Sequence, residues 1–309
     1  MPLLVNGKRV EVALLAREPL YSYPELEERA TFLRSQPAQT VGPRGLLYVQ
    51  QREFAATTPK DGSVSVLGSD DATTCHLVVL RHTGSGATCL THCDGSDTDK
   101  EVLLIANAVR VLSPNTQYGR LELHLVGGFS DDRHLSQKLT NQLLRAFDRL
   151  QDNIHLVTFC VTELNDRQEK GNHYPHIYGM ANVKTGEIFH ATFPDKGPEE
   201  DLRSASILTG AQMVNIYDSR KEQLCIGPYF WMPFPHADFW LEQDDQYILQ
   251  NLSTSPQAEP PHFISHIRAT LLCLKEHPFP DKTLFPSRKP WIYIKNGDGL
   301  WERLSPEQI

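Results

Sequence analysis

Apolar residues recur along this chain with two different spacings, which predict two kinds of element. Short runs in which apolar or β-branched residues alternate with polar ones predict strands, and apolar residues spaced three or four apart predict helices. The predicted strands are residues 45–51, 63–68, 75–82, 87–92, 120–128, 155–164, 176–183, 186–193, 213–218, 223–229 and 290–296. The predicted helices are residues 23–35, 101–112, 130–150 and 261–276.

The order of these elements indicates the fold class. Strands outnumber helices and often follow one another directly, which favours an α+β fold: a layered sandwich of antiparallel sheets with helices packed on one side. Ser-Thr-Ser-Pro at 253–256 and the prolines at 260 and 261 predict a turn or short linker. We therefore expect a main domain over residues 1–255, with a C-terminal helix and tail over 256–309 packed on it as one compact unit.

Composition limits the ligand classes and the cellular compartment that we expect for the protein. The 309 residues are 40% hydrophobic and carry a net charge of −8 without a block of positive charge, which argues against nonspecific nucleic-acid binding. No run approaches the ~20 apolar residues of a membrane span, and the N-terminus lacks the apolar region of a secretory signal. Six scattered cysteines suggest a reducing compartment rather than a disulfide framework. A cytoplasmic or nucleocytoplasmic protein is expected.

Candidate chemistry is concentrated in residues 68–95. Cys75 begins one apolar run, His92 lies at the end of the next, and the turn-rich HTGSG at 82–86 joins them. Two paired strands would bring the thiol and the imidazole together, within about 2.6–3.2 Å or somewhat looser without substrate. A neighbouring imidazolium lowers a thiol pKa from about 8.5 to roughly 3.5–7.5, which activates it for acyl transfer. His76 should point to the opposite face of the sheet.

A cysteine in a strand is more often a small core residue than a nucleophile. The polar residues before Cys75 argue instead for a position at the mouth of a strand. These residues are Ser69, Asp70, Asp71, Thr73 and Thr74.

Other motifs are less specific. CLTHC at 89–93 has zinc-ligand residue types without a second cysteine pair, and HYPH at 173–176 lacks the helical HExxH context, so we expect no metal and no cofactor. The glycine pair at 127–128 fits either an anion site at a helix N-terminus or a tight turn that permits close packing.

Several longer motifs together resemble one family. LGSDDATTCH (67–76), GATCLTHCDG (86–95), LHLVGGFSDDR (123–133), WMPFPHADFW (231–240) and QNLSTSPQAEPPHF (250–263) are all similar to the eukaryotic N-terminal asparagine amidohydrolases. The resemblance covers nearly the whole chain. A fainter one, a Cys followed by a His at similar strand positions, links it to bacterial chemoreceptor glutamine deamidases and toxin deamidases.

The resemblance implies an activity. A family member converts the side-chain amide of an N-terminal Asn to aspartate and ammonia, and the product is read by arginyl transfer and a ubiquitin ligase in the N-degron pathway. Residues 1–255 would then form the amidohydrolase domain of a monomer whose partners are proteins or peptides with an N-terminal Asn, without nucleic acid or membrane. Cys75 would attack the amide to form a thioester, His92 would transfer protons, and backbone N–H groups near Thr74 and Cys75 would stabilise the oxyanion.

Two assignments and two rival functions stay open. The third catalytic group, a Thr in the deamidases, is here Ser65 or Ser69. A carboxylate or a set of backbone carbonyls must meet the substrate α-ammonium, and among the carboxylates we favour Asp71 and Glu163 over Asp70 and Asp94. A non-catalytic adaptor would leave Cys75 as core packing. A cysteine peptidase is the rival among enzymes, although no C-G-S-C-W-like surround supports it.

Overall fold

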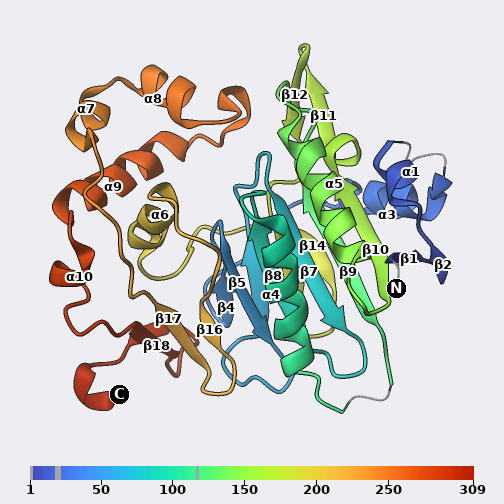
Figure 1. The fold of residues 1–309 in the computed structure, drawn as a ribbon, viewed down its shortest axis with the longest axis horizontal. Helices are drawn as coiled ribbons and strands as arrows, with labels where there is room; N and C mark the ends of the chain where they lie inside the picture. Colours follow the sequence, from blue (N-terminus) through green and yellow to red (C-terminus); the bar gives the residue numbers. More distant parts are fainter. Residues whose placement is uncertain (1–2, 18–21, 116–117) are drawn as a thin grey trace.

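A large mixed β-sheet forms the middle layer of the protein, in a computed structural model that describes residues 3–17, 22–115 and 118–309 (Figure 1). Its strand order is β15-β5-β8-β7-β9-β10-β1-β2. In that order the strands are β15 (Val214–Asn215), β5 (Glu53–Thr57), β8 (Thr88–Cys93), β7 (His76–His82), β9 (Leu121–Gly127), β10 (Ile154–Val161), β1 (Leu3–Val5) and β2 (Lys8–Arg9).

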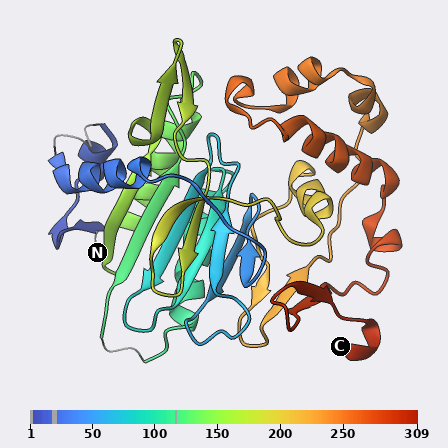
Figure 2. The ribbon, with the colours of Figure 1, turned by 180° about the vertical axis from the view of Figure 1, so that it is seen from behind.

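Helices cover one face of this sheet and a second sheet covers the other (Figures 1 and 2). The covering helices are α4 (Thr98–Val111) and α5 (Leu135–Asp148). The second sheet has the order β3 (Gln39–Thr40), β14 (Ile188–Thr192), β13 (Met180–Val183), β6 (Val66–Ser69) and β4 (Leu46–Tyr48). Because β7 and β8 lie between two layers, their residues are almost all buried instead of alternating between buried and exposed.

Helix α5 shows how the local sequence specifies its element. Leu139, Leu143 and Phe147 recur at helical spacing and are buried against the sheet. The carboxylate of Asp131 accepts hydrogen bonds from the backbone N–H groups of Leu135 and Ser136, both at 2.9 Å, which satisfies donors that the first turn leaves free.

The remaining elements flank these layers. They comprise the hairpin β11 (Asp166–Glu169) and β12 (Asn172–Pro175), and a sheet of β16 (Tyr217–Asp218), β17 (Gln223–Ile226), β18 (Trp291–Lys295) and β19 (Trp301–Arg303). The further helices are α1 (Val12–Arg17), α3 (Pro24–Ser35), α6 (Glu200–Leu208), α7 (Ala237–Glu242), α8 (Asp245–Leu252), α9 (Phe263–Glu276) and α10 (Pro280–Thr283). The short 3₁₀ turns are η1 (Thr162–Asn165), η2 (Pro256–Ala258) and η3 (Pro306–Gln308).

The α+β class is confirmed, and the sheets contain parallel as well as antiparallel pairs. Strands β9 and β10 run parallel because α5 carries the chain back across the sheet between them. The predicted strand 155–164 ends at Val161, since Thr162 takes a φ of +51° and the chain turns into η1. The sequence pattern did not predict β1, β2, β3, β5, β11, β12, β19, α1, α6, α7, α8 or α10.

A buried ion pair attaches α6 to the sheets. The guanidinium of Arg203, 1% exposed, contacts both carboxylate oxygens of Glu53 at 2.6 and 3.1 Å and donates to the Tyr48 carbonyl at 2.7 Å. Helix α9 packs on α6, α7 and α8, so helices on both sides of residue 255 are in contact (Figure 1). A domain division at 255 stays a prediction. None of the helices in the described ranges is long and apolar enough to span a membrane.

Candidate active site

Cys75 lies in the loop immediately before β7 and is half-buried. The chain at Gly127 passes directly behind it, because a Cβ atom there would lie 2.5 Å from the Cys75 carbonyl oxygen. Gly127 also has a φ of +134°, which L side chains rarely adopt. At Gly127 the glycine pair therefore permits close packing, the second of the two interpretations that the sequence left open. The packing partner is the loop of residues 70–75, here called the nucleophile loop after the predicted role of Cys75.

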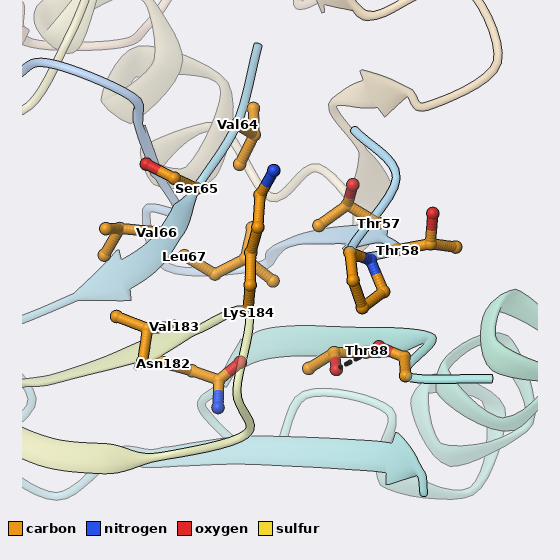
Figure 3. A pocket seen from close by; sticks show the side chains of 12 residues that line it. Thr57, Thr58, Val64, Ser65, Val66, Leu67, Thr88, Asn182, Val183 and Lys184 are labelled. Carbon is orange, nitrogen blue, oxygen red and sulfur yellow. Dashed lines mark hydrogen bonds between the residues drawn. The ribbon is translucent and has the colours of Figure 1, made fainter. Parts of the chain in front are cut away.

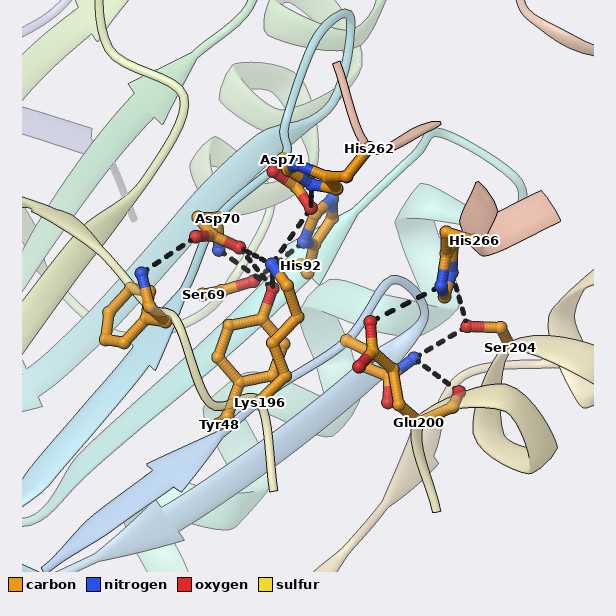
Figure 4. Close-up of polar contacts among 12 residues, drawn as sticks. Tyr48, Ser69, Asp70, Asp71, His92, Lys196, Glu200, Ser204, His262 and His266 are labelled. Atoms are coloured by element: carbon orange, nitrogen blue, oxygen red, sulfur yellow. Dashed lines mark hydrogen bonds and ion pairs between the residues drawn. The ribbon is translucent and has the colours of Figure 1, made fainter. Parts of the chain in front are cut away.

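Strand register places Cys75 and His92 on the same face of the sheet. His92 in β8 lies opposite Leu77 in β7, and Cys75 precedes Leu77 by two residues. This face looks toward the second sheet, since Nδ1 of His92 lies 2.8 Å from the Ser69 hydroxyl of β6 (Figure 4). The structure therefore brings His92 and Ser69 into contact and places Cys75 on their side of the hairpin.

Ser69 fixes the proton on the His92 ring. Its hydroxyl donates to the backbone carbonyl of Val49 at 2.6 Å, so its single proton is already used. The same oxygen must therefore accept a hydrogen bond from Nδ1–H of His92. In the neutral imidazole this leaves the lone pair on Nε2, the nitrogen that acts as a base. Ser65, the other candidate, contacts the Gly45 carbonyl instead, at 3.4 Å.

The opposite face of the same hairpin carries a second Cys–His pair. His76 lies directly opposite Cys93, and both are fully buried. Nε2 of His76 lies 2.6 Å from the hydroxyl of Thr140 in α5, which confirms that His76 points away from the face of His92.

The thiol and imidazole are both neutral in the resting site. Burial raises the pKa of Cys75 well above its usual value, and Asp94 and Glu259 raise it further. Burial lowers the pKa of His92 to about 4. The expected thiolate–imidazolium pair is therefore not the resting state, because burial disfavours both charged forms. Among the described residues no hydrogen bond joins Cys75 to His92.

Two aspartates before Cys75 form a network with residues from distant parts of the chain (Figure 4). Asp70 is buried; it accepts from the Tyr48 hydroxyl at 2.5 Å and pairs with Lys196. Asp71 contacts Nζ of Lys196 at 2.9 Å and Nε2 of His262 at 2.7 Å. These hydrogen bonds, that of His262 first, lower the pKa of Asp71 to about 2 despite its burial. Asp71 therefore already has two basic partners.

The other predicted substrate-binding residues lie apart from one another. The hydroxyl of Thr74 lies 3.5 Å from that of Thr254. Glu163 is exposed on η1, which follows β10, and β10 is separated from β7 by β9. In the described structure it contacts none of Cys75, His92 and Ser69 through a hydrogen bond or ion pair.

A segment that the sequence analysis did not assign to the site crosses the nucleophile loop. Residues 253–262, here called the crossing segment, contact that loop through Thr254 and His262. Within it, the Ser253 hydroxyl donates to Glu259 at 2.5 Å. Burial raises the pKa of Glu259 to about 7. No local signal marks Glu259 or Lys196 as site residues, since the fold alone brings Glu259 toward Cys75 and Lys196 to Asp70 and Asp71.

Metal-binding residue types are scattered in the described ranges, and one small cavity lies apart from this site. Across the part of the chain that the structure describes, no three His, Cys, Asp or Glu side chains are grouped to hold a metal ion. A cavity of about 20 Å³ lies between Thr88, Ser65 and Lys184 (Figure 3). Thr88 begins β8 whereas His92 lies near its end, so this cavity is at the far end of the strand, and its volume suits about one water.

The whole chain matches known proteins of one kind. The sequence profile described as "Protein N-terminal asparagine amidohydrolase" matches residues 36–303. The chain belongs to this family.

Relatives with that name occur in animals and plants. The protein from pig (Sus scrofa) is 66% identical over 306 residues, covering 99% of this chain and 98% of its own. The human protein (Homo sapiens) is 65% identical with 99% of both chains covered. The protein from Arabidopsis thaliana is 27% identical and covers 97% of this chain and 92% of its own. The family match extends over Cys75, His92, Ser69 and the crossing segment alike.

Proposed function

We propose that this protein hydrolyses the side-chain amide of an N-terminal Asn in proteins or peptides to aspartate and ammonia. The observation that carries the proposal is the placement of His92. Ser69 holds its Nδ1–H, so the basic Nε2 is left for the face on which the half-buried thiol of Cys75 lies. The name of the family and of its animal and plant members supports the choice of substrate.

The first half of the reaction transfers the acyl group to sulfur. The sulfur of Cys75 attacks the amide carbon while Nε2 of His92 takes the thiol proton, so the nucleophile ionises only as it reacts. The lowered pKa of His92 keeps its base form populated at neutral pH. His92 then gives the proton to the departing nitrogen, which leaves as ammonia, and a thioester remains.

The second half of the reaction uses the same groups with water. Nε2 of His92 removes a proton from water, which attacks the thioester carbon. Collapse of the intermediate breaks the C–S bond, the proton on His92 returns to the sulfur of Cys75, and the carboxylic acid that forms loses its own proton to the solvent to give the aspartate side chain. Backbone N–H groups of Thr74 and Cys75 stabilise the oxyanion in both halves, an effect of about 10²–10³-fold per donor.

The product suggests where the protein acts. An N-terminal Asp produced in this way would enter the N-degron pathway and ubiquitin-dependent degradation, in the cytoplasm or nucleus. The six cysteines are all free, which fits a reducing compartment.

Ammonia release from an Asn-initiated peptide, with mass spectrometry of the product, tests the proposed function. We expect one ammonia per peptide and an unchanged number of residues. A shortened peptide would indicate a peptidase. Binding without ammonia release would indicate an adaptor, and either result would overturn the proposal.

A further inference from the structure

An enzyme that accepts only a terminal Asn has to recognise the free α-ammonium, because an internal Asn lacks this group. The receptor has to lie near the sulfur of Cys75 and to have no other cation bound. This question rests on the proposed function and concerns the same site. The carboxylates near the nucleophile loop differ in whether they already have a partner.

Most of these carboxylates are already occupied. Asp70 and Asp71 share Lys196, and Asp71 also contacts His262. Asp94 is held by Nε of Arg52 at 2.6 Å. The charge of each of these three aspartates is therefore already balanced by a basic side chain.

The other two carboxylates are less suited to receive a peptide's ammonium. Glu101 on α4 also raises the pKa of the Cys75 thiol, but it is only 2% exposed, so a peptide has no access to it. Glu163 is exposed on η1, which follows β10.

Glu259 differs from the three aspartates in its partners and from the buried Glu101 in being only half-buried. It is close enough to raise the pKa of the Cys75 thiol, yet it forms no ion pair in the described ranges. One oxygen accepts the Ser253 hydroxyl at 2.5 Å, and the other has no hydrogen-bond partner in the same part of the chain. Nearby Ser255 is 2% exposed, and its hydroxyl too is without a partner among the residues that the structure describes.

Glu259 is held in place at the nucleophile loop from three sides. Thr254 contacts Thr74, the residue before Cys75, and His262 contacts Asp71 at 2.7 Å. The Tyr178 hydroxyl donates to the carbonyl of Ala258 at 2.7 Å, directly before Glu259. We propose that the Glu259 carboxylate is the receptor for the α-ammonium of the N-terminal Asn and thereby determines that the Asn must be terminal.

This assignment predicts a particular pH dependence. The pKa of Glu259 is raised to about 7, first by burial and then by Asp71, while His262 opposes the rise. Cys75 and Tyr178 also face this carboxylate. Below that pKa the carboxylate is protonated and no longer attracts an ammonium. Since the pKa of His92 is about 4, a loss of activity near pH 7 would belong to Glu259 rather than to the base.

The test compares two peptides with two variants. The first peptide begins with Asn, and the second begins with a succinamoyl group, which keeps the carboxamide and lacks the α-amine. The variants are Glu259→Gln and, as a matched control, Glu276→Gln at the exposed end of α9. Ammonia release gives kcat/KM for each combination of protein and peptide from pH 5 to 9. Thermal melts establish that each variant is folded.

We expect the unmodified protein and Glu276→Gln to prefer the Asn peptide by about 10- to 100-fold, the size of a desolvated charge-assisted hydrogen bond. Glu259→Gln should lose this preference, together with the decline in kcat/KM near pH 7, while keeping its slow turnover of the succinamoyl peptide. A preference that persists in Glu259→Gln would overturn the assignment and leave the proposed function intact.

Two further outcomes complete the test. Absence of ammonia from both peptides with the unmodified protein would overturn the proposed function itself and the assignment with it. If Glu259→Gln fails to fold, the unmodified protein alone decides, since its preference for the Asn peptide should fall as the pH is lowered through 7. A preference that is constant from pH 5 to 7 would contradict the role of Glu259.

Discussion

The hairpin of β7 and β8 carries a cysteine–histidine pair on each face, and only one of the two pairs is suited to catalysis. Cys75 and His92 face the second sheet, where the thiol is half-buried. His76 and Cys93 face the helices and are completely buried. Residue type and strand position are thus almost the same on both faces, and the surrounding layers make the difference.

The contacts of each histidine show what that difference consists of. Ser69 accepts the Nδ1–H of His92 and leaves Nε2 as a base on the face of the thiol. On the other face Nε2 of His76 is already engaged by Thr140, and Nδ1 is buried without a partner among the described residues. Burial lowers the pKa of both rings to about 4, so the pKa does not distinguish them. The two rings differ instead in their access to substrate and in the orientation of the free nitrogen.

The comparison is sharpest for the two cysteines. Cys75→Ala and Cys75→Ser should abolish ammonia release with a nearly unchanged melting temperature, because a thiol at the strand mouth adds little to the core and a hydroxyl ionises too weakly. Cys93→Ala should keep turnover within a fewfold and lose roughly 0.5–3 kcal/mol of unfolding free energy. Ammonia assays and thermal melts measure both. Substantial turnover by Cys75→Ala would remove the basis of the mechanism.

The histidines should differ by less. His92→Gln should lower kcat/KM by about 10²–10⁴-fold, the contribution of general acid–base catalysis. His76→Gln should reduce stability while changing kcat/KM far less, since His76 faces α5. Steady-state kinetics of both variants at pH 7 make the comparison. Equal losses in the two would mean that the hairpin as a whole, and not His92, supports the reaction.

Alkylation distinguishes the neutral pair from a preformed thiolate. Because the pKa of Cys75 is raised well above 9.0, its thiolate fraction should rise with pH throughout the range from 6 to 9. The rate of iodoacetamide labelling should therefore increase by about 10³-fold over that range. Cys93, which is fully buried, should stay unlabelled in the folded protein. A labelling rate at Cys75 that is already constant above pH 7 would indicate a thiolate–imidazolium pair.

The hydroxyls that support each histidine should give the smallest effects. Ser69→Ala removes the acceptor for Nδ1–H of His92 and should lower kcat by about 10-fold, the loss of one hydrogen bond. Ser65→Ala is its matched control and should have little effect. Thr140→Val on the other face should leave kcat unchanged and reduce stability by about 1–3 kcal/mol. A normal kcat for Ser69→Ala would show that the orientation of His92 has another source.

The sequence predicted those parts of the site that depend on local pattern. Period-two alternation placed His76 and His92 on opposite faces, and the polar residues before Cys75 predicted the mouth of a strand. The same pattern did not show that burial would keep both groups neutral, because pKa values depend on the layers that cover them. It also left Ser65 and Ser69 undecided, since the choice depends on how β6 packs on β8.

Contacts between segments that are distant in the sequence could not be predicted from the pattern of apolar and polar residues. Lys196 lies in a polar loop and Glu259 in a proline-rich turn, and such residues are usually solvated. Likewise, no periodicity indicates that Arg203 pairs with Glu53 across 150 positions. The α+β class could be predicted because it depends on the number and order of elements, whereas these pairings depend on the tertiary fold.

The contact between Asp71 and His262 spans 191 positions of a chain of 309 residues. During synthesis the chain emerges from its N-terminus, so Cys75 and His92 leave the ribosome long before the segment that crosses them. The nascent protein therefore carries Cys75 without the carboxylate of Glu259 or the neighbouring His262. A chain released early, before residue 253, would have the Cys75 thiol but not the surroundings that we propose select its substrate. On this proposal, completion of translation is also the step at which the protein acquires its specificity.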